Sequence, residues 1–576
     1  MRLLFLVVLA ALAYRPVLSD TQLLQDRELG SSSTTDPLQY YRKSWHSSVL
    51  LLETLYIDGG DFWYVSEDGS AVAYPYNSTY SLDLSTSWSP KDVPLNKIDK
   101  GNSPVLNRPN LWPAPDGNSF YSFNGDVSKA GYNKTTDPPS TPQLWQFRPD
   151  GKHNGTWSLA GTASSLIQVG AARSTFGNGS AYILGGTTNW RTTRLYGNHT
   201  TYTGTGNGII SYSMNNQTWQ NQSMAGAAPT GWLYEGELHW VDNLGGSGLV
   251  VALGGVTAAG QTLVPFDYVS FFNPITGKWR NQSTTGAIPS PRRRACSVGV
   301  PGDNGTYEIF LHGGSIIPAA SYFRTVLQAD IDLDQVWVLS LPSFIWYKSN
   351  YQPTDARCLH TCHVPGNPPR RQMVAVGGIP PDLEYSLQPR DLWPQGLGIF
   401  DLTEMQWRDN YDANADAYAT PRMVKDGIAK EGMYPKEWDS PEVAEWLTGK
   451  SLADTVGTTS SPRSSSGTGN SSSGTGDSSS GTGGSKKGAI AGGVVAGVVG
   501  AGVLLAGLKM ALRKRKQRLH QNALHSKNGY EKPELEAASA PPGSTQTGAL
   551  QRANNNHAEL NNDPLAASNN RPVYEM

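Results

Sequence analysis

Aromatic and arginine side chains gather in three long polar segments of the sequence, at about residues 126–141, 187–208 and 379–395. Tyrosine, tryptophan and arginine are enriched at binding hot spots because each combines a large contact area with polar groups. We therefore expect ligand contacts from these segments. The alternative is that the rings only pin the segments to the scaffold beneath them. The candidate residues are Tyr132, Trp190, Arg191, Arg194, Tyr196, Tyr385, Arg390 and Trp393.

Residue types that serve catalysis or metal binding are scattered along the chain. A lone histidine on a strand is more often a hydrogen-bonded core residue than a ligand, and the sequence offers five of this kind: His46, His239, His312, His360 and His363. The run CLHTCH, residues 358–363, is similar to a haem-attachment motif, but its spacing is one residue too long. We predict no catalytic residue, no metal site and no cofactor.

Two marks recur six times between residues 50 and 410: an apolar strand that ends in a glycine pair and, some 30 residues later, a single Trp. Such a period indicates one supersecondary unit copied and stacked, because a single copy cannot bury its apolar face alone. The glycine pairs are Gly59-Gly60, Gly185-Gly186, Gly254-Gly255, Gly313-Gly314 and Gly377-Gly378, with Gly125 in a degraded sixth copy. The tryptophans are Trp88, Trp157, Trp219, Trp279, Trp346 and Trp407.

Each copy is predicted to hold four strands. The apolar run suits a strand buried on both faces, and the glycines permit the positive φ of a sharp turn. An aromatic or alternating strand follows, then an outer strand with the Trp, and a further strand precedes each apolar run. Six four-stranded sheets close into a β-propeller, which protects the strand edges. The fold class is therefore all-β, with six blades over residues 40–420. A seventh blade made from the segments near Tyr40 and Pro421 is the alternative.

The glycine pair, the aromatic strand and the spaced Trp resemble the kelch repeat. The wider layout is similar to fungal single-pass membrane proteins that carry a galactose-oxidase-like kelch propeller outside the cell. Propellers of this kind host enzymes, adhesion modules and scaffolds, so the resemblance implies the fold more than the function. A copper oxidase of that superfamily would need a Tyr-His pair at the metal. The sequence contains no adjacent Tyr and His.

In a propeller, the loops between strands 2 and 3 emerge on the same face as the linkers between blades. The three long segments begin directly after glycine pairs, so they are loops of this type and share one face. Long loops on a rigid scaffold are the usual place for binding.

Arginines near the innermost strands allow two interpretations: Arg42, Arg108, Arg173, Arg293 and Arg357. They could form a basic ring for an anionic ligand, densest at residues 292–294. Alternatively, each could bond carbonyls or carboxylates of a neighbouring blade. Glu235 at the matching place in the fourth copy favours the second interpretation.

The cysteines are few for a secreted protein of this size. Cys358 and Cys362 could close a small disulfide loop in an oxidising compartment. Cys296 would then be free or paired across blades.

The ends of the chain predict its compartment. Residues 1–19 read as a signal peptide, and residues 488–508 carry no charge and are long enough to span a bilayer. Basic residues follow the span, which places the tail, 509–576, in the cytoplasm as a disordered segment. Residues 421–450 form an extension with a short helix that starts at Ser440 and Pro441, and 451–487 form a Ser/Gly/Thr-rich stalk. Gly-x-x-x-Gly pairs in the span admit a homodimer.

All the Asn-x-Ser/Thr sequons precede the span, as the orientation requires. They lie at Asn77, Asn133, Asn154, Asn178, Asn198, Asn216, Asn221, Asn281, Asn304 and Asn470. A net charge of -2 argues against a nucleic-acid partner. The sequence thus predicts a non-catalytic cell-surface propeller that binds an extracellular glycan or protein. The alternatives are an enzyme of the galactose-oxidase superfamily and a structural wall or adhesion component.

Overall fold

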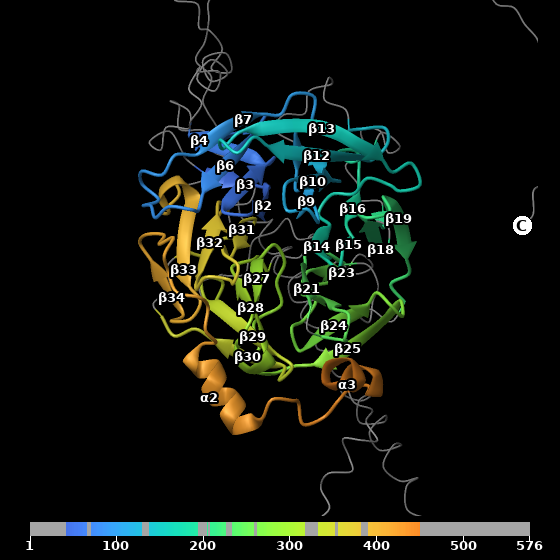
Figure 1. Cartoon of the computed structure of the whole chain (residues 1–576), viewed down its shortest axis with the longest axis vertical. Coiled ribbons are helices and arrows are strands. Elements are labelled where there is room, and N and C mark those ends of the chain that lie inside the picture. Colours follow the sequence, from blue (N-terminus) through green and yellow to red (C-terminus); the bar gives the residue numbers. More distant parts are fainter. Residues whose placement is uncertain are drawn as a thin grey trace, which may run out of the picture. The chain divides into compact units, whose positions relative to one another are not determined.

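Six four-stranded antiparallel sheets surround one axis in the computed structural model (Figure 1). The structure describes residues 42–449 except for 66–70, 76, 129–137, 194–203, 206–207, 226–232, 243, 258–261, 317–331, 352–354 and 382–389. All the described residues belong to the first of two units, Met1–Arg463. The predicted signal peptide, stalk, membrane span and tail lie outside the described residues. The predicted count of six blades is confirmed.

Each blade is one contiguous piece of chain whose strands follow one another from the axis outward. Blade 1 holds β2 (Ser47–Leu51), β3 (Thr54–Asp58), β6 (Ser78–Asp83) and β7 (Asn96–Asp99). Blade 2 holds β9 (Asn110–Pro113), β10 (Phe120–Phe123), β12 (Gln143–Pro149) and β13 (Gly155–Thr162). Blade 3 holds β14 (Arg173–Gly177), β15 (Ser180–Leu184), β18 (Ile209–Ser213) and β19 (Thr218–Gln222).

The other three blades repeat this order. Blade 4 holds β21 (Glu237–Val241), β22 (Leu249–Leu253), β24 (Tyr268–Asn273) and β25 (Lys278–Ser283). Blade 5 holds β27 (Cys296–Pro301), β28 (Tyr307–His312), β29 (Val336–Leu341) and β30 (Ile345–Lys348), and β26 (Thr285–Gly286) joins β30 in parallel. Blade 6 holds β31 (Thr361–His363), β32 (Gln372–Val376), β33 (Leu397–Asp401) and β34 (Gln406–Arg408).

Short ladders lie on the face of the loops between strands 2 and 3. They are β1 (Arg42–Ser44) with β4 (Asp61–Val65) and β5 (Ala71–Pro75), β8 (Leu106–Asn107) with β11 (Asp126–Val127), β16 (Thr187–Thr188) with β17 (Gly204–Thr205), and β20 (Leu233–Tyr234) with β23 (Val256–Thr257). Two 3-10 turns, η3 (Asp303–Gly305) and η5 (Pro394–Gly396), complete the elements of the propeller.

The glycine pairs join each blade to the next. The second glycine donates its N–H to a carbonyl of the following blade, as in Gly314 to Arg357 at 2.9 Å and Gly378 to Lys43 at 2.7 Å. A Cβ on Gly313, which has a φ of +70°, would lie 2.2 Å from the Arg357 oxygen. Glycine is therefore required by this close approach as well as by its backbone conformation. In the degraded copy, Asn124 takes the first position with a φ of +60°.

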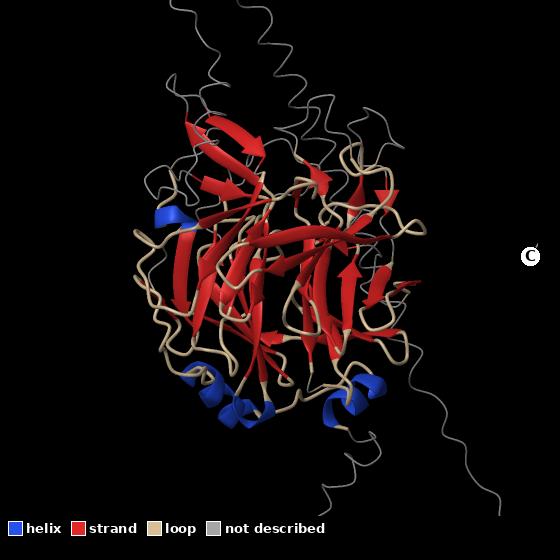
Figure 2. Cartoon of the chain, turned by 45° about the horizontal axis from the view of Figure 1, so that its top comes forward, coloured by secondary structure: helices blue, strands red, loops and turns tan. Residues whose placement is uncertain are grey.

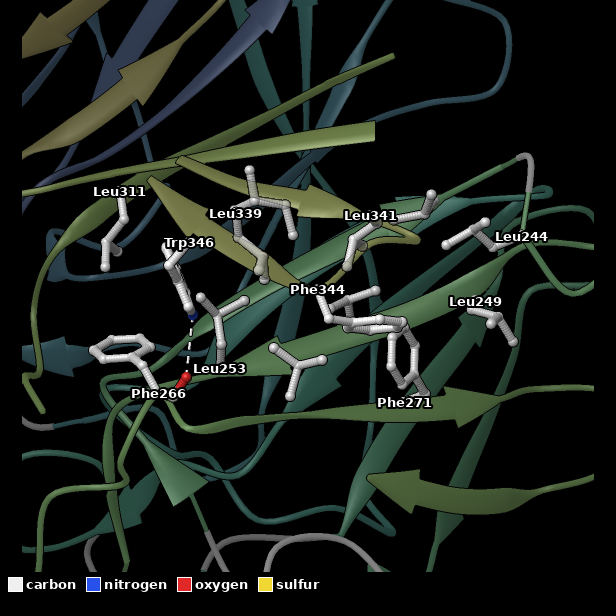
Figure 3. Close-up of a cluster of buried hydrophobic side chains, with 14 of the residues drawn as sticks. Leu244, Leu249, Leu253, Phe266, Phe271, Leu311, Leu339, Leu341, Phe344 and Trp346 are labelled. Atoms are coloured by element: carbon white, nitrogen blue, oxygen red, sulfur yellow. Dashed lines mark hydrogen bonds between the residues drawn. The ribbon is translucent and has the colours of Figure 1, made fainter. Parts of the chain in front are cut away.

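The recurring tryptophans fill the space between blades, as the sequence predicts. Trp279 of blade 4 is 1% exposed and packs in a cluster with Tyr182 and Leu184 of blade 3. Figure 3 shows the next case, in which Trp346 of blade 5 donates from Nε1 to the Phe266 carbonyl of blade 4 at 3.1 Å. Each such ring removes a large apolar area from water, and Trp346 also uses its polar edge.

Trp88 departs from the predicted pattern. It does not lie on the outer strand of blade 1, which is β7, but in the segment that precedes this strand. Its backbone forms a β-bridge with Tyr411, and the two rings stack with centroids 4.9 Å apart. Trp88 thus closes the ring between blades 1 and 6, which is the task that its counterparts perform elsewhere.

The extension after blade 6 covers the edge of the propeller opposite the loop ladders. α2 (Arg422–Glu431) buries Val424 in a cluster with residues of blade 5, and α3 (Pro441–Thr448) buries Val443 and Leu447 against blade 4. Ser440 caps α3 by accepting from the Val443 N–H at 3.2 Å, at the predicted start. Figure 2 shows both helices at the lower end of the strands.

None of the helices in the described part of the chain is long and apolar enough to cross a bilayer.

Candidate ligand-binding face and axial chamber

The face with the loop ladders has the same base in every blade. The residue after the glycine pair forms an antiparallel pair with the residue three positions before the first residue of the innermost strand. This pair anchors the stem of each loop between strands 2 and 3. The six pairs are Asp61 with Ser44, Asp126 with Asn107, Thr187 with Gly170, Val256 with Tyr234, Ser315 with Arg293, and Ile379 with Cys358.

A ring of left-handed residues follows these ladders on the axis: Trp45, Arg108, Ala171, Glu235, Arg294 and Leu359, with φ between +52° and +63°. Their backbones bond to one another across blades. The Arg108 N–H donates to the Trp45 carbonyl at 2.7 Å, and the Arg294 N–H donates to the Glu235 carbonyl at 3.0 Å. Non-glycine residues adopt this conformation only where the surroundings impose it, so the ring marks a tightly determined centre.

Four side chains of this ring form an axial cluster, which we define as Trp45, Arg108, Glu235 and Arg294. The guanidinium groups of Arg108 and Arg294 each lie 4.7 Å from the centre of the Trp45 ring. Glu235 is paired with Arg108 at 2.8 Å, Arg294 at 2.8 Å and also Arg293 at 2.9 Å. Burial alone would raise the pKa of Glu235, but the three arginines outweigh it and lower this pKa to about 2. The cluster is therefore an ionised centre near neutral pH and is almost shielded from solvent.

A cavity of about 170 Å³ is lined by Arg108, Glu235 and Arg294 of the axial cluster and by innermost strands of all six blades. Polar side chains line it, one from each blade in turn: Ser48, Asn110, Arg173, Glu237, Ser297 and His363. Pockets that enclose a typical organic ligand measure about 300 to 1,000 Å³, whereas a water molecule needs about 30 Å³. The axial chamber thus fits a few waters or a very small polar molecule.

Hydrogen bonds cross the chamber wall between blades 4 and 5. The Ser297 hydroxyl donates to Glu237 at 2.8 Å and lies 2.8 Å from Nε2 of His239. Burial lowers the pKa of His239 to about 4, so its ring is neutral near neutral pH. The serine stands between the histidine and the acid, whereas a nucleophilic triad needs the histidine in the middle. This arrangement serves to join two blades.

The same two strand positions carry a disulfide between blades 5 and 6. Cys296 of β27 bonds to Cys362 of β31, with Cα atoms 5.7 Å apart, and the predicted pairing of Cys358 with Cys362 is wrong. Cys358 is buried in the ladder with Ile379 and takes no part in this bond. The left-handed turn at Leu359 separates Cys358 from the strand, so Cys362 faces the neighbouring blade instead.

One of the two predicted contact residues in the blade 3 loop stem, Arg191, holds loop stems together. The side chain of Arg191 pairs with Asp126 at 2.6 Å, and its carbonyl accepts from the Val127 N–H at 3.0 Å. Half-buried Trp190 stands next to it, in a turn built on Asn189. Arg191 therefore links the loop of blade 3 to that of blade 2, while Trp190 remains a candidate for contact with a ligand.

Trp393 and Arg390 lie at the end of the blade 6 loop. Half-buried Trp393 lies under the Arg357 guanidinium, 3.2 Å from its ring centre, and stacks on His312. This position matches the alternative in which an aromatic ring pins its loop. Arg390 is exposed, and its carbonyl accepts from Arg42 at 3.4 Å. Tyr132, Arg194, Tyr196 and Tyr385 lie outside the described residues.

Most of the arginines near the innermost strands bond neighbouring blades. Arg42 donates to the Gly378 carbonyl of blade 6 at 3.0 Å, Arg173 donates to that of Gly236 before blade 4 at 2.9 Å, and Arg293 pairs with Glu235 at 2.9 Å. Arg357 instead donates to the Gly377 carbonyl of its own blade at 2.7 Å. The first three contacts agree with the second interpretation of these residues. Sequence reasoning did not find the axial cluster or the chamber, although Glu235 at a position held by arginine elsewhere signals such a pair.

Among the sequons, Asn77, Asn154, Asn178, Asn216 and Asn221 are exposed, while Asn281 is half-buried. Asn133, Asn198 and Asn470 lie outside the described residues, and glycosylation of all these sites stays a prediction.

Comparison with known proteins gives one curated relative. A Kelch repeat-containing protein of Arthroderma benhamiae is 26% identical over 415 residues, which cover 64% of this chain and 57% of that protein. This chain is a homologue of a Kelch repeat-containing protein. It spans only 57% of the length of this relative. The glycine pairs and tryptophans that resemble the kelch repeat agree with the match.

No protein-family model matches the chain. A solved structure described as the structure of YjhT matches with a TM-score of 0.42 and 13% identity, over 64% of this chain and 97% of that one.

Proposed function

We propose that this protein is a non-catalytic, single-pass type I membrane protein of the cell surface whose propeller binds an extracellular glycan or protein on its loop face. The observation that carries the proposal is the anchoring of the long loops. Their stems are fixed to the scaffold and to one another before any ligand arrives. Such preorganisation favours binding because less conformational entropy is lost.

The loops of blades 2 and 3 share one anchor. Asp126, at the stem of the blade 2 loop, is fully buried. Its carboxylate forms ion pairs with Arg108 at 3.0 Å and with Arg191 of the blade 3 loop. Ser128 and Asn107 donate to the neighbouring Asp61, which extends the network to blade 1. The described stems of these two loops are therefore held at a fixed spacing.

The loop of blade 6 has its own anchor at Asp391. This buried carboxylate forms ion pairs with Arg357 at 3.1 Å and with Arg42 at 3.8 Å. It also accepts a hydrogen bond from the Trp393 backbone N–H at 3.0 Å. Arg42 belongs to the segment before blade 1, so the anchor spans the closing junction of the ring.

The size of the axial chamber favours the loop face as the place of contact. A cavity of about 170 Å³ cannot enclose a sugar chain or a peptide. The ligand class we propose binds across an open face, where aromatic and arginine side chains provide the contact area.

The C-terminal extension favours the same face. α2 and α3 cover the edge opposite the loop ladders: the Trp446 carbonyl accepts from Gly245 in the turn between β21 and β22, and Lys425 pairs with Asp303 of η3. A tether that continues from residue 449 therefore starts at the edge opposite the loops. In our proposal this leaves the loop face open to solvent.

The binding experiment uses cells that display the full chain, probed with a panel of wall polysaccharides and secreted proteins. Replacing Trp190, Tyr196 and Tyr385 together by Ala should abolish capture, with thermal melting unchanged because loop side chains contribute little to the blade cores. Tyr434→Ala is the matched control, since this aromatic ring is 47% exposed in the C-terminal extension. Unchanged capture by the triple variant would contradict the loop face as the binding site.

The membrane orientation is tested separately. Glycosidase treatment should increase the mobility of the protein on a gel, and an antibody should reach a C-terminal tag only after permeabilisation. Labelling of the tag on intact cells would overturn the orientation without bearing on ligand binding.

A further inference from the structure

Two buried histidines meet at the junction of blades 5 and 6. His312 ends β28 and His360 directly precedes β31, and both are 1% exposed. Nδ1 of His312 lies 3.1 Å from Nε2 of His360, and the ring planes are 84° apart. Only one of these two nitrogens carries a proton in a hydrogen bond between neutral rings.

The disulfide lies beside this pair. Cys296 is the register partner of His312 across β27 and β28, and Cys362 is two residues from His360. One ligand atom from each of Cys296, His312 and His360 lies within 4.8 Å of the other two. The junction thus brings two sulfurs and two imidazoles together.

The geometry of the nitrogens resembles that of metal ligands. Two imidazole nitrogens bound to zinc at 2.0–2.1 Å and at a tetrahedral angle lie about 3.3 Å apart, close to the 3.1 Å found here. Among the described residues, Nε2 of His312 and Nδ1 of His360 have no hydrogen-bond partner. A metal bound by the two facing nitrogens would leave these outer nitrogens as the protonated ones of two neutral rings.

We propose that Cys296, Cys362, His312 and His360 form a Cys₂His₂ site for a divalent transition metal such as Zn²⁺ when the disulfide is reduced. A phosphine reductant and one water convert the disulfide into two thiols and a phosphine oxide. Zn²⁺ then replaces the two thiol protons, which are released to solvent. The oxidised chain holds an interblade disulfide and the reduced chain holds the metal, in the same place.

Access and charge both agree with such a site. Cys296, His360 and Cys362 line the axial chamber, which gives an ion a route to them. The buried guanidinium groups of Arg292 and Arg357 donate to the carbonyls of Gly313 and Gly377 beside this junction. Positive charge so close favours thiolates over thiols. Two thiolates neutralise Zn²⁺, whereas the disulfide offers no charge. The oxidised chain should therefore reject the cation.

The experiment titrates the full chain with Co²⁺, in its oxidised form and after anaerobic treatment with a water-soluble phosphine. The oxidised chain should bind none at this site. The reduced chain should bind one Co²⁺ with thiolate charge-transfer absorption, lose it to Zn²⁺, and melt at a higher temperature with Zn²⁺ present. Absence of binding by the reduced chain would overturn the proposal, as would loss of its native circular dichroism in the presence of metal.

Variants identify the ligands. Cys296→Ser with Cys362→Ser should remove the absorption, and His312→Gln or His360→Gln should weaken Co²⁺ at least tenfold, each checked for folding by melting of the oxidised chain. Cys358→Ala and His239→Gln are matched controls that should bind like the parent. Loss of binding in Cys358→Ala, or full binding in both His312→Gln and His360→Gln, would refute this ligand set. The site is independent of ligand binding on the loop face.

Discussion

The axis and the periphery of this propeller are held together by different chemistry. On the axis, blades are joined by ion pairs, hydrogen bonds and one disulfide between short strands. Further out, they are joined by tryptophans and aliphatic side chains, such as those in the cluster around Trp346. The outer residues repeat from copy to copy and define the fold, whereas the axial residues differ in every blade and give the ring its individual properties.

Three consecutive junctions show how far the axial residues differ. At the same pair of strand positions, Glu237 meets Ser297, Cys296 meets Cys362, and Thr361 meets Ser48 at 2.5 Å. The first residue of each pair faces the residue before a glycine pair in the strand register. One structural position therefore accepts a charged, a covalent and a neutral polar link.

The largest loss of stability is expected from Trp279→Ala at the periphery. Removing a fully buried aromatic ring leaves a cavity between blades 3 and 4 and should cost about 3 to 5 kcal/mol. Denaturant unfolding measures this cost, with half-buried Trp219→Ala as a milder comparison. A loss below about 1 kcal/mol would break the contrast between periphery and axis.

The disulfide should have the largest effect on the axis. The cross-link joins residues 66 positions apart, and closing a loop of this length stabilises the fold by on the order of 4 kcal/mol. Cys296→Ser with Cys362→Ser should lower the unfolding free energy by that amount, measured without metal. Cys358→Ala should not, because Cys358 is outside the bond. Equal stability of the double variant and the parent would show that noncovalent contacts alone hold this junction.

Two buried glutamates allow the axis and the periphery to be compared through the pH dependence of stability. Arginines hold Glu235 ionised on the axis, whereas burial raises the pKa of Glu308 at the periphery to about 7, despite hydrogen bonds from Thr306, Tyr418 and Ser340. Because the fold favours the protonated form, Glu308 contributes to the free energy of unfolding. This contribution is complete below pH 4.5 and is lost as the pH rises through 7.

The loss through this window should be on the order of 3 kcal/mol, and Glu308→Gln should remove it. Melting between pH 5 and about 8.5 compares the variant with the parent. An identical pH dependence for both proteins would exclude Glu308 as its source.

The smallest effect is expected from Ser297→Ala. The substitution removes the hydroxyl that Glu237 and His239 share, and an unsatisfied buried partner costs about 1 to 2 kcal/mol. Ser174→Ala, on the equivalent strand position of blade 3, is the control. A cost as large as that of the disulfide would mean that this hydrogen bond, and not the covalent link, dominates the axis.

Features that repeat from blade to blade could be predicted from the sequence, whereas contacts that occur in a single blade or junction could not. Glycine pairs and tryptophans predict six blades because each copy must satisfy the same packing. The Cys296 link was misassigned because sequence proximity favoured Cys358, whereas strand register placed Cys362 opposite a cysteine 66 residues away.

Helix α2 was missed for a related reason. Gly427 lies in its middle and weakens its intrinsic helical tendency. A Cβ there would lie 2.1 Å from the hydroxyl of Tyr347, so tertiary packing requires the glycine. Among the loop residues, the sequence could name side chain types but could not separate Trp393, which packs inward, from Trp190.

The path of the chain beyond blade 6 determines how the propeller bears mechanical load. A pull on residue 449 acts first on α3, held on blade 4 by Val443, Leu447 and the Arg280–Glu442 pair at 2.7 Å. It reaches α2 only after α3 has been released, and the bridge between Tyr411 and Trp88 only after that. Force would therefore detach the extension in successive steps before it reached β34, and the six blades would stay closed while the tether lengthened.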